Sequence, residues 1–258
     1  MRLLILGGTT EASALARRIA GRRDLQPILS FAGRTRNPVP PAIPYRVGGF
    51  GGVEGLKAFL IDQRIEAVID ATHPFAVQMS RNSAAACGDL AVPLAVFTRP
   101  AWRPIDGDRW VCVPDMEAAV RAPGDSPRRV FLTIGGLQLG AFAAAPQHHF
   151  IVRTIERPDA IGLLPSHRLI LARGPFSVEQ EISLMRAERV EVLITKNSGG
   201  SATEAKIAAA RSLGIEVVMI ERPASCGGPS FDAVDAVLNW IEGHRRTRST
   251  IPAEERPA

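Results

Sequence analysis

Apolar runs alternate with amphipathic stretches along the chain. Arg2–Leu6 is almost wholly apolar, which is typical of a strand buried on both faces of a parallel sheet. After the turn at Gly7–Thr10, the apolar residues Ala12, Leu15, Ala16 and Ile19 recur at helical spacing. The same pattern predicts further strands at 27–31, 42–47, 67–70 and 92–97, with helices at 53–63 and 75–87.

A second alternating series follows a stretch of different composition. Residues 99–128 hold several prolines and glycines and two tryptophans, which favours a domain boundary there. Beyond them the pattern predicts strands at 130–134, 149–154, 169–172, 192–195 and 216–220, with helices at 177–187, 202–213 and 231–242. We therefore expect an α/β protein with an N-terminal domain at 1–125, a C-terminal domain at 126–243 and a disordered tail at 244–258.

This alternation predicts two Rossmann-like, doubly wound parallel-sheet domains with a cleft between them. The 258 residues are 46% hydrophobic and 22% charged, and their net charge is +5, mostly from arginine. No basic stripe is apparent, so nucleic acid is disfavoured as a partner, whereas a small anionic ligand suits this charge. Three isolated cysteines, no signal peptide and no long apolar run favour the cytoplasm and disfavour a membrane or protein-bound metal.

The first candidate site is the turn Gly7, Gly8, Thr9, Thr10 and Glu11, between a strand and a helix. Backbone N–H groups at such a helix start bind phosphate, so we assign these residues to a coenzyme. Thr9 replaces the second glycine of the dinucleotide fingerprint, and a plain strand-to-helix turn remains the alternative.

The second predicted strand indicates which coenzyme is used. An acid near its end would hold the ribose 2′-OH of NADH, but this chain has Ser30, Arg34 and Arg36 instead. These residues suit the 2′-phosphate of NADPH, and a solvated loop is the alternative. Thr72 and His73 follow the fourth strand at the same sheet edge, where His73 could bind the coenzyme or move a proton, or merely be structural.

In the second half, Lys196, Ser198, Gly199 and Gly200 form another loop between a strand and a helix. Gly135–Gly136 and Gly174–Ser177 are similar loops, so we expect an anion-binding wall. Further arginines could hold carboxylates or be solvated surface charges; they are Arg81, Arg99, Arg153, Arg157, Arg173 and Arg222.

Six motifs in this order resemble the precorrin-6A reductase family. They are LILGGTTEASALA, DATHPFAVQMSRNSAAAC, VPLAVFTRPAW, FLTIGG, ARGPFS and ITKNSGGSATEAKIAAARSLGIEVVMIERP, and the match spans about residues 2–241. The resemblance implies reduction of precorrin-6A to precorrin-6B by NADPH in cobalamin biosynthesis. It implies coenzyme binding at Gly7–Thr10 and a functional segment at Asp70–Pro74. It also implies tetrapyrrole binding by the second domain, at Lys196, Ser198, Gly199 and Gly200.

Other functions stay open at this point. They are reduction of the cobalt-containing ring, an NADP-binding epimerase-like or sensor protein, and a nucleotide-free transferase. No YxxxK, GxSxG or GxxxxGK[ST] motif is present, which disfavours short-chain dehydrogenases, α/β-hydrolases and P-loop proteins. The proton donor could be His73 or solvent. The oligomeric state is open and compatible with a monomer.

Overall fold

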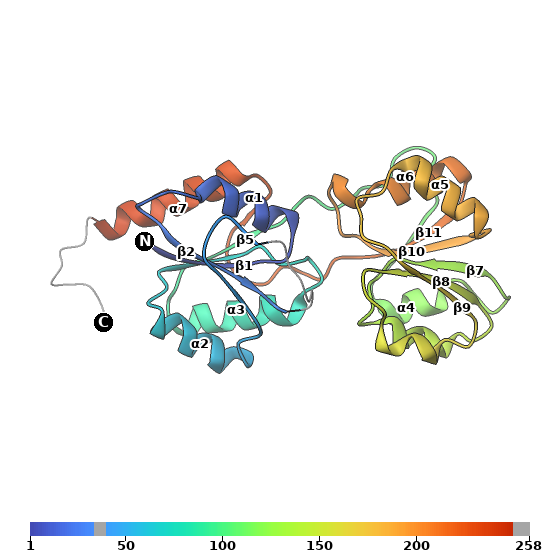
Figure 1. Cartoon of the computed structure of the whole chain (residues 1–258), viewed down its shortest axis with the longest axis horizontal. Coiled ribbons are helices and arrows are strands. Elements are labelled where there is room, and N and C mark those ends of the chain that lie inside the picture. Colours follow the sequence, from blue (N-terminus) through green and yellow to red (C-terminus); the bar gives the residue numbers. More distant parts are fainter. Residues whose placement is uncertain (34–39, 250–258) are drawn as a thin grey trace. The chain divides into compact units, whose positions relative to one another are not determined.

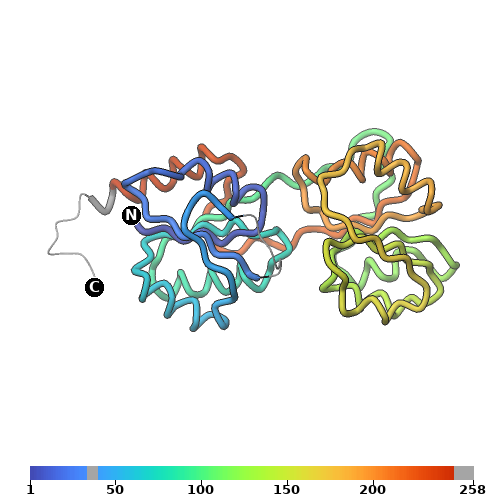
Figure 2. Tube along the Cα trace, viewed as in Figure 1, coloured from blue at the N-terminus to red at the C-terminus, as the bar shows by residue number. Residues whose placement is uncertain are grey.

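The computed structural model describes residues 1–33 and 40–249. The chain divides into two compact units, which we describe separately (Figures 1 and 2). The first consists of Met1–Arg99 together with the segment from Pro223 onward, and the second is Pro100–Arg222. No helix in the described part of the chain is long and apolar enough to cross a membrane.

The first unit is built on a six-stranded parallel sheet in the order β12-β5-β4-β1-β2-β3. The strands are β1 (Arg2–Leu6), β2 (Gln26–Phe31), β3 (Tyr45–Val47), β4 (Ala67–Asp70), β5 (Leu94–Phe97) and β12 (Ser230–Phe231). The chain moves outward from β1 to β3, returns to β4 beside β1, and continues in the opposite direction. This reversal between β1 and β4 is the point at which doubly wound folds bind ligands.

Helices cover both faces of this sheet (Figure 1). On one face, α1 (Thr10–Ile19) and α7 (Val234–Ser249) bury their apolar sides against β1 and β4. On the other, α2 (Gly52–Asp62) and α3 (Val77–Asp89) pack over Leu4, Leu6 and Val68. Successive residues of β1 enter opposite cores, which explains why the whole strand is apolar.

The second unit repeats the arrangement with its own parallel sheet, in the order β6-β11-β10-β7-β8-β9. Its strands are β6 (Trp110–Val113), β7 (Arg129–Leu132), β8 (His149–Thr154), β9 (His167–Leu171), β10 (Val192–Lys196) and β11 (Glu216–Ile220). Helices α5 (Val178–Ala187) and α6 (Ala205–Leu213) cover one face, and α4 (Met116–Arg121) lies on the other (Figure 1). Three short 3₁₀ helices complete it: η1 (Leu139–Ala144), η2 (Asp159–Leu163) and η3 (Ser201–Thr203). Both units confirm the predicted α/β class with two doubly wound parallel sheets.

The sixth strand of each sheet breaks the chain order. β6 follows β5 in sequence but pairs with β11 of the second sheet. The sixth position of the first sheet is taken by β12, which comes after the whole second unit and pairs with β5. The chain therefore crosses between the units twice, once after Arg99 and once after Arg222.

This exchange places the boundaries differently from the expected division into 1–125, 126–243 and a tail. Residues 100–125 belong to the second unit because they contribute β6 and α4, and α7 belongs to the first unit. Prolines and glycines around a four-residue strand gave this stretch the composition of a linker. The tail expected from residue 244 is helical up to Ser249, and residues 250–258 lie outside the described part.

Candidate functional site

The glycine turn connects β1 to α1 at the carboxyl edge of the first sheet. A side chain at Gly7 would place its Cβ 2.6 Å from Leu29 Cδ1, and Gly8 has a φ of +117°. The backbone conformation of Gly8 favours glycine, and a side chain at Gly7 would have to displace the buried Leu29 side chain. The N–H of Gly7 donates to the Ser30 carbonyl at 2.9 Å, which ties the turn to the end of β2.

Thr9 explains why this turn departs from the usual glycine fingerprint. Its Oγ1 accepts a hydrogen bond from Ala12 N at 3.1 Å and caps α1. The same hydroxyl donates to the Ala71 carbonyl at 2.7 Å, beyond the end of β4. A glycine here could make neither bond. Thr9 thus joins the glycine turn to the Asp70–Pro74 segment across the topological switch.

Glu11 and Arg99 form an ion pair over the first turn of α1. Arg99 Nη1 lies 2.7 Å from Glu11 Oε2, and the two side chains are only 14% and 17% exposed. Burial would raise the pKa of Glu11, but its backbone hydrogen bond and Arg99 outweigh that effect and lower the pKa. Glu11 was predicted to bind the coenzyme and Arg99 the substrate. The structure brings them together, and their roles towards ligands stay predictions.

Asp70 organises the loop that follows β4. Its carboxylate is 2% exposed and accepts hydrogen bonds from the Thr72 N–H at 3.0 Å and from the Thr72 and Ser80 hydroxyls, both at 2.6 Å. Three donors thus fix Thr72 against the start of α3. Cys87 is buried nearby, and burial, together with the charge of Asp70, raises its pKa to about 12. This thiol stays protonated, so it is not a nucleophile.

His73 is half-buried and stands next to this carboxylate network. Its Nδ1 faces the N–H of Phe75 at 3.2 Å, so Nδ1 accepts that hydrogen bond. A neutral His73 consequently carries its proton on Nε2. The register pairs Leu6 with both Ser30 and Asp70, so the turn, the end of β2 and this loop share one sheet edge.

The ends of β2 and β3 carry a second polar cluster that the sequence had indicated only in part. Ser30 is buried, and its Oγ accepts a hydrogen bond from Arg46 Nη1 at 2.8 Å. Arg46 had not been selected from the sequence, although its place one residue before the end of β3, opposite Ser30, could have indicated it. Arg34 and Arg36, which were predicted to lie here, are outside the described residues.

In the second unit, Asn197 fixes the loop that follows β10. Its side chain pairs with the backbone of Trp102, accepting from the N–H at 2.8 Å and donating to the carbonyl at 3.0 Å. Trp102 Nε1 donates in turn to the Gly200 carbonyl at 3.0 Å. A Cβ at Gly199, where φ is +67°, would lie 2.0 Å from the Pro100 carbonyl oxygen, so only glycine fits. The predicted residues Lys196, Ser198, Gly199 and Gly200 therefore lie on one tightly constrained loop.

Arg222 forms hydrogen bonds with backbone carbonyls of the same loop. Its Nε donates to the Asn197 carbonyl at 2.7 Å, and its Nη2 donates to the carbonyls of Ser198 at 2.8 Å and Pro100 at 3.2 Å. One guanidinium thus connects the Lys196–Gly200 loop to both points where the chain enters and leaves the unit. These contacts indicate a structural role for Arg222.

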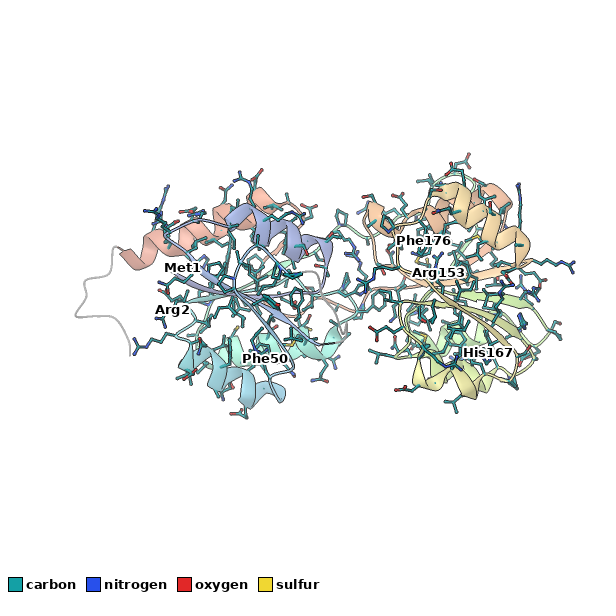
Figure 3. The ribbon with its side chains drawn as sticks, in the orientation of Figure 1. Met1, Arg2, Phe50, Arg153, His167 and Phe176 are labelled. Atoms are coloured by element: carbon teal, nitrogen blue, oxygen red, sulfur yellow. The ribbon has the colours of Figure 1, made fainter. Side chains whose placement is uncertain are left out.

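Arg153, labelled in Figure 3, is also occupied, in an ion pair with Glu181 of the second unit. Its guanidinium makes two hydrogen bonds to Glu181, at 2.9 and 2.7 Å, and lies 4.0 Å from the centre of the Phe176 ring. The side chains of Arg153 and Glu181 are 10% and 2% exposed. The charge of Arg153 is therefore already balanced, and its predicted contact with substrate stays a prediction.

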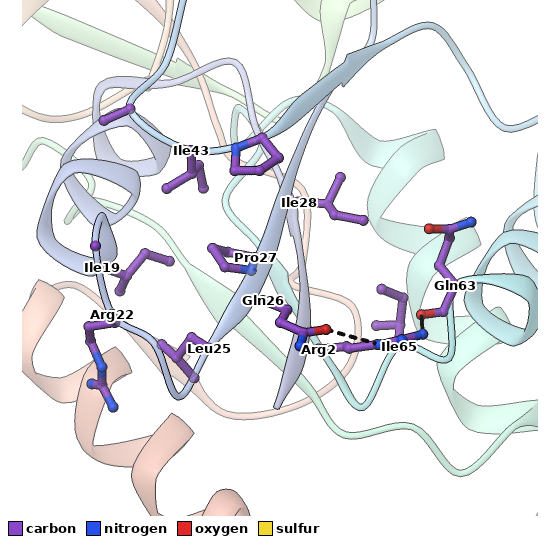
Figure 4. A pocket seen from close by; sticks show the side chains of 13 residues that line it. Arg2, Ile19, Arg22, Leu25, Gln26, Pro27, Ile28, Ile43, Gln63 and Ile65 are labelled. Carbon is purple, nitrogen blue, oxygen red and sulfur yellow. Dashed lines mark hydrogen bonds between the residues drawn. The ribbon is translucent and has the colours of Figure 1, made fainter.

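The remaining predicted arginines are exposed. Arg81 lies on α3 of the first unit, and Arg173 precedes the Gly174–Ser177 loop of the second; no contact among the described residues joins either to the loops above. A cavity of about 510 Å³ also lies in the first unit (Figure 4). Its lining includes Arg2, Gln26 and Ile65, which belong to the amino edge of the sheet, opposite the glycine turn. The residues predicted to bind ligands lie at the carboxyl edge of the sheet, away from this cavity.

Comparison with known proteins shows which family the whole chain resembles. The family model for "Precorrin-6x reductase CbiJ/CobK" matches residues 2–242. The chain belongs to the precorrin-6x reductase family. A precorrin-6A reductase of Rhodobacter capsulatus is 47% identical over 246 residues, covering 95% of this chain and 98% of the relative. One from Mycobacterium tuberculosis is 44% identical, covering 94% and 98%.

Within this reductase family, a solved structure titled "CobK precorrin-6A reductase" shares the fold. Its TM-score is 0.88 at 46% identity, and the match covers 95% of this chain and 97% of that one. A more distant relative from Priestia megaterium, a cobalt-precorrin-6A reductase, is 26% identical over 257 residues. The family-model match to residues 2–242 includes both β6 and β12.

Proposed function

We propose that this protein reduces precorrin-6A to precorrin-6B, using NADPH, in cobalamin biosynthesis. The observation that carries the proposal is near-complete coverage by relatives named precorrin-6A reductase, at 44–47% identity. Because both units are covered, the proposal concerns the whole reaction rather than coenzyme binding alone. An epimerase-like or sensor protein that uses only the first unit would not account for the Lys196–Gly200 loop of the second unit.

The metal-free ring is the substrate that we favour over the cobalt-containing one. Relatives named for the cobalt substrate are 26–27% identical to this chain, well below those named for the metal-free substrate. Among the described residues, no group of three or more His, Cys, Asp or Glu side chains could hold a metal ion. Cobalt would in any case belong to the substrate.

The first unit supports the binding of a nicotinamide coenzyme. No described atom lies within 4 Å of the position that a Cβ on Gly8 would take, which leaves the backbone there open to a pyrophosphate, and the N-terminus of α1 supplies N–H groups and the positive end of the helix dipole beside it. The bound coenzyme would supply the hydride. We assign its pyrophosphate to Gly7–Thr10 and keep Glu11, Thr72 and His73 as further contacts at the same sheet edge.

NADPH rather than NADH is the coenzyme that we propose. The end of β2 carries Ser30 where an NADH site would have an acid to bind the ribose 2′-OH. A carboxylate there would repel a 2′-phosphate, so its absence removes the main obstacle to NADPH. Arg34 remains a predicted contact outside the described residues.

Precorrin-6A bears carboxylate arms around its ring, and the second unit offers groups that suit them. Lys196 supplies a positive charge at the end of β10, and the glycines of the adjoining loop expose backbone beside it. We assign Lys196, Ser198, Gly199 and Gly200 to the substrate, with exposed Arg173 as a further contact.

Reduction of a ring double bond also requires a proton beside the carbon that receives the hydride. His73 is our candidate because an imidazole can release a proton near neutral pH, and Nε2 would be the donating atom, since Nδ1 faces the Phe75 N–H. A solvent molecule is the other donor that we consider. The three cysteines are free, and we propose the cytoplasm as the compartment, since thiols stay reduced there.

An anaerobic assay with purified protein and authentic precorrin-6A tests the proposal. NADPH absorbance would be followed with the metal-free substrate, with the cobalt-containing ring and with NADH in parallel. We expect consumption of NADPH that depends on precorrin-6A, with both alternatives much poorer. Turnover of the cobalt ring alone would contradict the substrate assignment, and no turnover of either would contradict the reductase proposal.

Two lysine variants sharpen this test. Lys196→Met should lower kcat/KM for precorrin-6A by roughly tenfold or more, because a charge-assisted contact to a carboxylate is lost. Lys57→Met is the matched control, since Lys57 lies on α2, paired with Glu54 and Asp89. Equal effects of the two changes would show that Lys196 acts only through general charge.

A further inference from the structure

The end of β3 carries an arginine whose surroundings match a phosphate site. Arg46 stands directly beside Ser30 in the sheet register, and Ser30 accepts the N–H of Gly7 through its carbonyl. β2 lies between Arg46 and the glycine turn, and the guanidinium bonds the Ser30 hydroxyl at the end of β2. In doubly wound folds, the group at the end of the second strand determines which ribose is accepted.

The bonding of Arg46 leaves part of its guanidinium available. Nη1 donates to Ser30 Oγ at 2.8 Å and to the Gly48 carbonyl at 2.9 Å, and Nη2 donates to the Gly49 carbonyl at 3.1 Å. A guanidinium has five N–H groups, so the N–H of Nε and one N–H of Nη2 remain. Two such donors are what a phosphate binds in bidentate geometry.

The charge of Arg46 is also unbalanced. All its hydrogen bonds among the described residues go to neutral oxygens, and no carboxylate in that part of the chain forms an ion pair with it. Burial lowers the pKa of Arg46 below its ordinary value because the cation loses water without gaining an anion. An arriving phosphate would supply that missing negative charge.

Aromatic rings hold the guanidinium in place. Its central carbon lies 4.2 Å from the centre of the Phe50 ring and 5.3 Å from that of Phe59 (Phe50 is labelled in Figure 3). The Phe50 ring packs edge-on against the Phe59 ring, with centroids 5.1 Å apart, and the Phe50 backbone lies so close to α2 that a Cβ on Gly55 would be 1.7 Å from its carbonyl oxygen. A pre-oriented guanidinium loses little conformational entropy when it binds an anion.

We propose that Arg46 recognises the 2′-phosphate of the coenzyme and so determines the preference for NADPH over NADH, with Ser30 as its positioning residue. This inference rests on the proposed function only in requiring that the first unit bind a nicotinamide coenzyme. Ser30 acts through Arg46, since its side chain is buried beneath the guanidinium. The predicted direct contact of Ser30 with the phosphate thus becomes an indirect one.

A purely structural role would have a different signature. If Arg46 served only to fix the Gly48–Gly52 segment, its loss would weaken every adenine nucleotide alike. If it binds the 2′-phosphate, its loss would weaken only ligands that carry this group. The ratio of two affinities therefore separates the roles, whatever happens to overall affinity.

The experiment is calorimetric titration of the full chain with adenosine 2′,5′-bisphosphate and with adenosine 5′-monophosphate. The wild type should prefer the bisphosphate, and Arg46→Met should reduce that preference by roughly tenfold to a hundredfold, as expected for loss of a charge-assisted pair. Arg46→Lys, which keeps the charge but cannot make the three bonds, should retain part of it. Ser30→Ala should reduce it less than Arg46→Met.

Arg2→Met is the matched control. Arg2 also bonds a side-chain oxygen and a backbone carbonyl, on Gln26 and Gln63, but at the opposite edge of the same sheet. It should leave the ratio unchanged. An unchanged ratio in Arg46→Met and Arg46→Lys, or no preference in the wild type, would overturn the inference. An Arg46-dependent ratio in a protein that does not reduce precorrin-6A would support the inference while refuting the proposed reaction.

Discussion

At the scale of single residues, several polar side chains near the loops form hydrogen bonds with backbone groups of other segments. Thr9 caps α1 and bonds the Ala71 carbonyl, while Asn197 pairs with both backbone groups of Trp102. Such bonds connect segments that are far apart in sequence and leave the loops little freedom. Because the lost partners would be buried carbonyls and N–H groups, replacing these side chains has a cost beyond the bond itself.

Thr9→Val tests this for the glycine turn. Valine has nearly the shape of threonine but removes the cap of α1 and leaves the Ala71 carbonyl without its donor, so we expect a loss of about 2 kcal/mol in unfolding free energy. Urea unfolding measures the loss, and NADPH affinity should fall with it. Thr9→Ser keeps the hydroxyl and should stay close to the wild type. A Val variant as stable as the Ser variant would contradict the role that we give to this hydroxyl.

At the scale of elements, strands and helices with a clear apolar periodicity can be predicted from the sequence, whereas very short edge strands cannot. Long apolar strands such as β1 and β10, and helices with an apolar face, follow from periodicity alone. β6 and β12 are edge strands of four and two residues and carry too little pattern to be recognised. The glycine loops were predictable because a close approach or a positive φ demands glycine.

The arginines were harder to predict, because their partners lie far away in the sequence. Arg153 is 28 residues from Glu181, and Arg46 is 16 from Ser30. No local pattern tells a solvated arginine from one that is paired or waiting for an anion. The composition indicated many arginines as candidate anion-binding residues. Only their contacts distinguish Arg46, which has no carboxylate partner among the described residues, from Arg153, which pairs with Glu181, and from Arg222, which bonds loop carbonyls.

The pair Arg153–Glu181 joins β8 to α5 beneath the Gly174–Ser177 loop. Arg153→Met alone should cost about 3–5 kcal/mol in unfolding free energy, because it leaves a buried carboxylate unpaired. Adding Glu181→Leu should restore much of this loss, which a double-mutant cycle by urea unfolding would detect. The exposed pair Arg121–Glu117, with side chains 65% and 81% exposed, is the control and should couple by less than about 0.5 kcal/mol. Additive losses at Arg153 and Glu181 would contradict this account.

At the scale of the whole chain, the two units differ in that one is formed by a continuous segment and the other by two separate segments. The second is one uninterrupted segment, Pro100–Arg222, that contains all six strands of its sheet. The first needs two distant segments, since β12 completes its sheet and α7 buries Val237 and Ile241 against the core of α1. We therefore expect the second unit to fold without the rest of the chain, and the first to require the segment from Pro223 onward.

Fragments test this directly. The fragment 100–222 should unfold cooperatively in urea, followed by the fluorescence of Trp102 and Trp110. The fragment 1–99 should not, because it lacks β12 and α7 and exposes the apolar surface that they cover. A fusion of 1–99 to 223–249 through a flexible linker should recover a cooperative transition, reported by Trp240.

The fragment 126–243 is the matched control: it follows the boundaries that composition favours, lacks β6 and α4, and carries β12 and α7 without their partners. It should show no cooperative transition. Cooperative unfolding of 126–243, or of 1–99 alone, would mean that the exchanged strands contribute little to the stability of either unit.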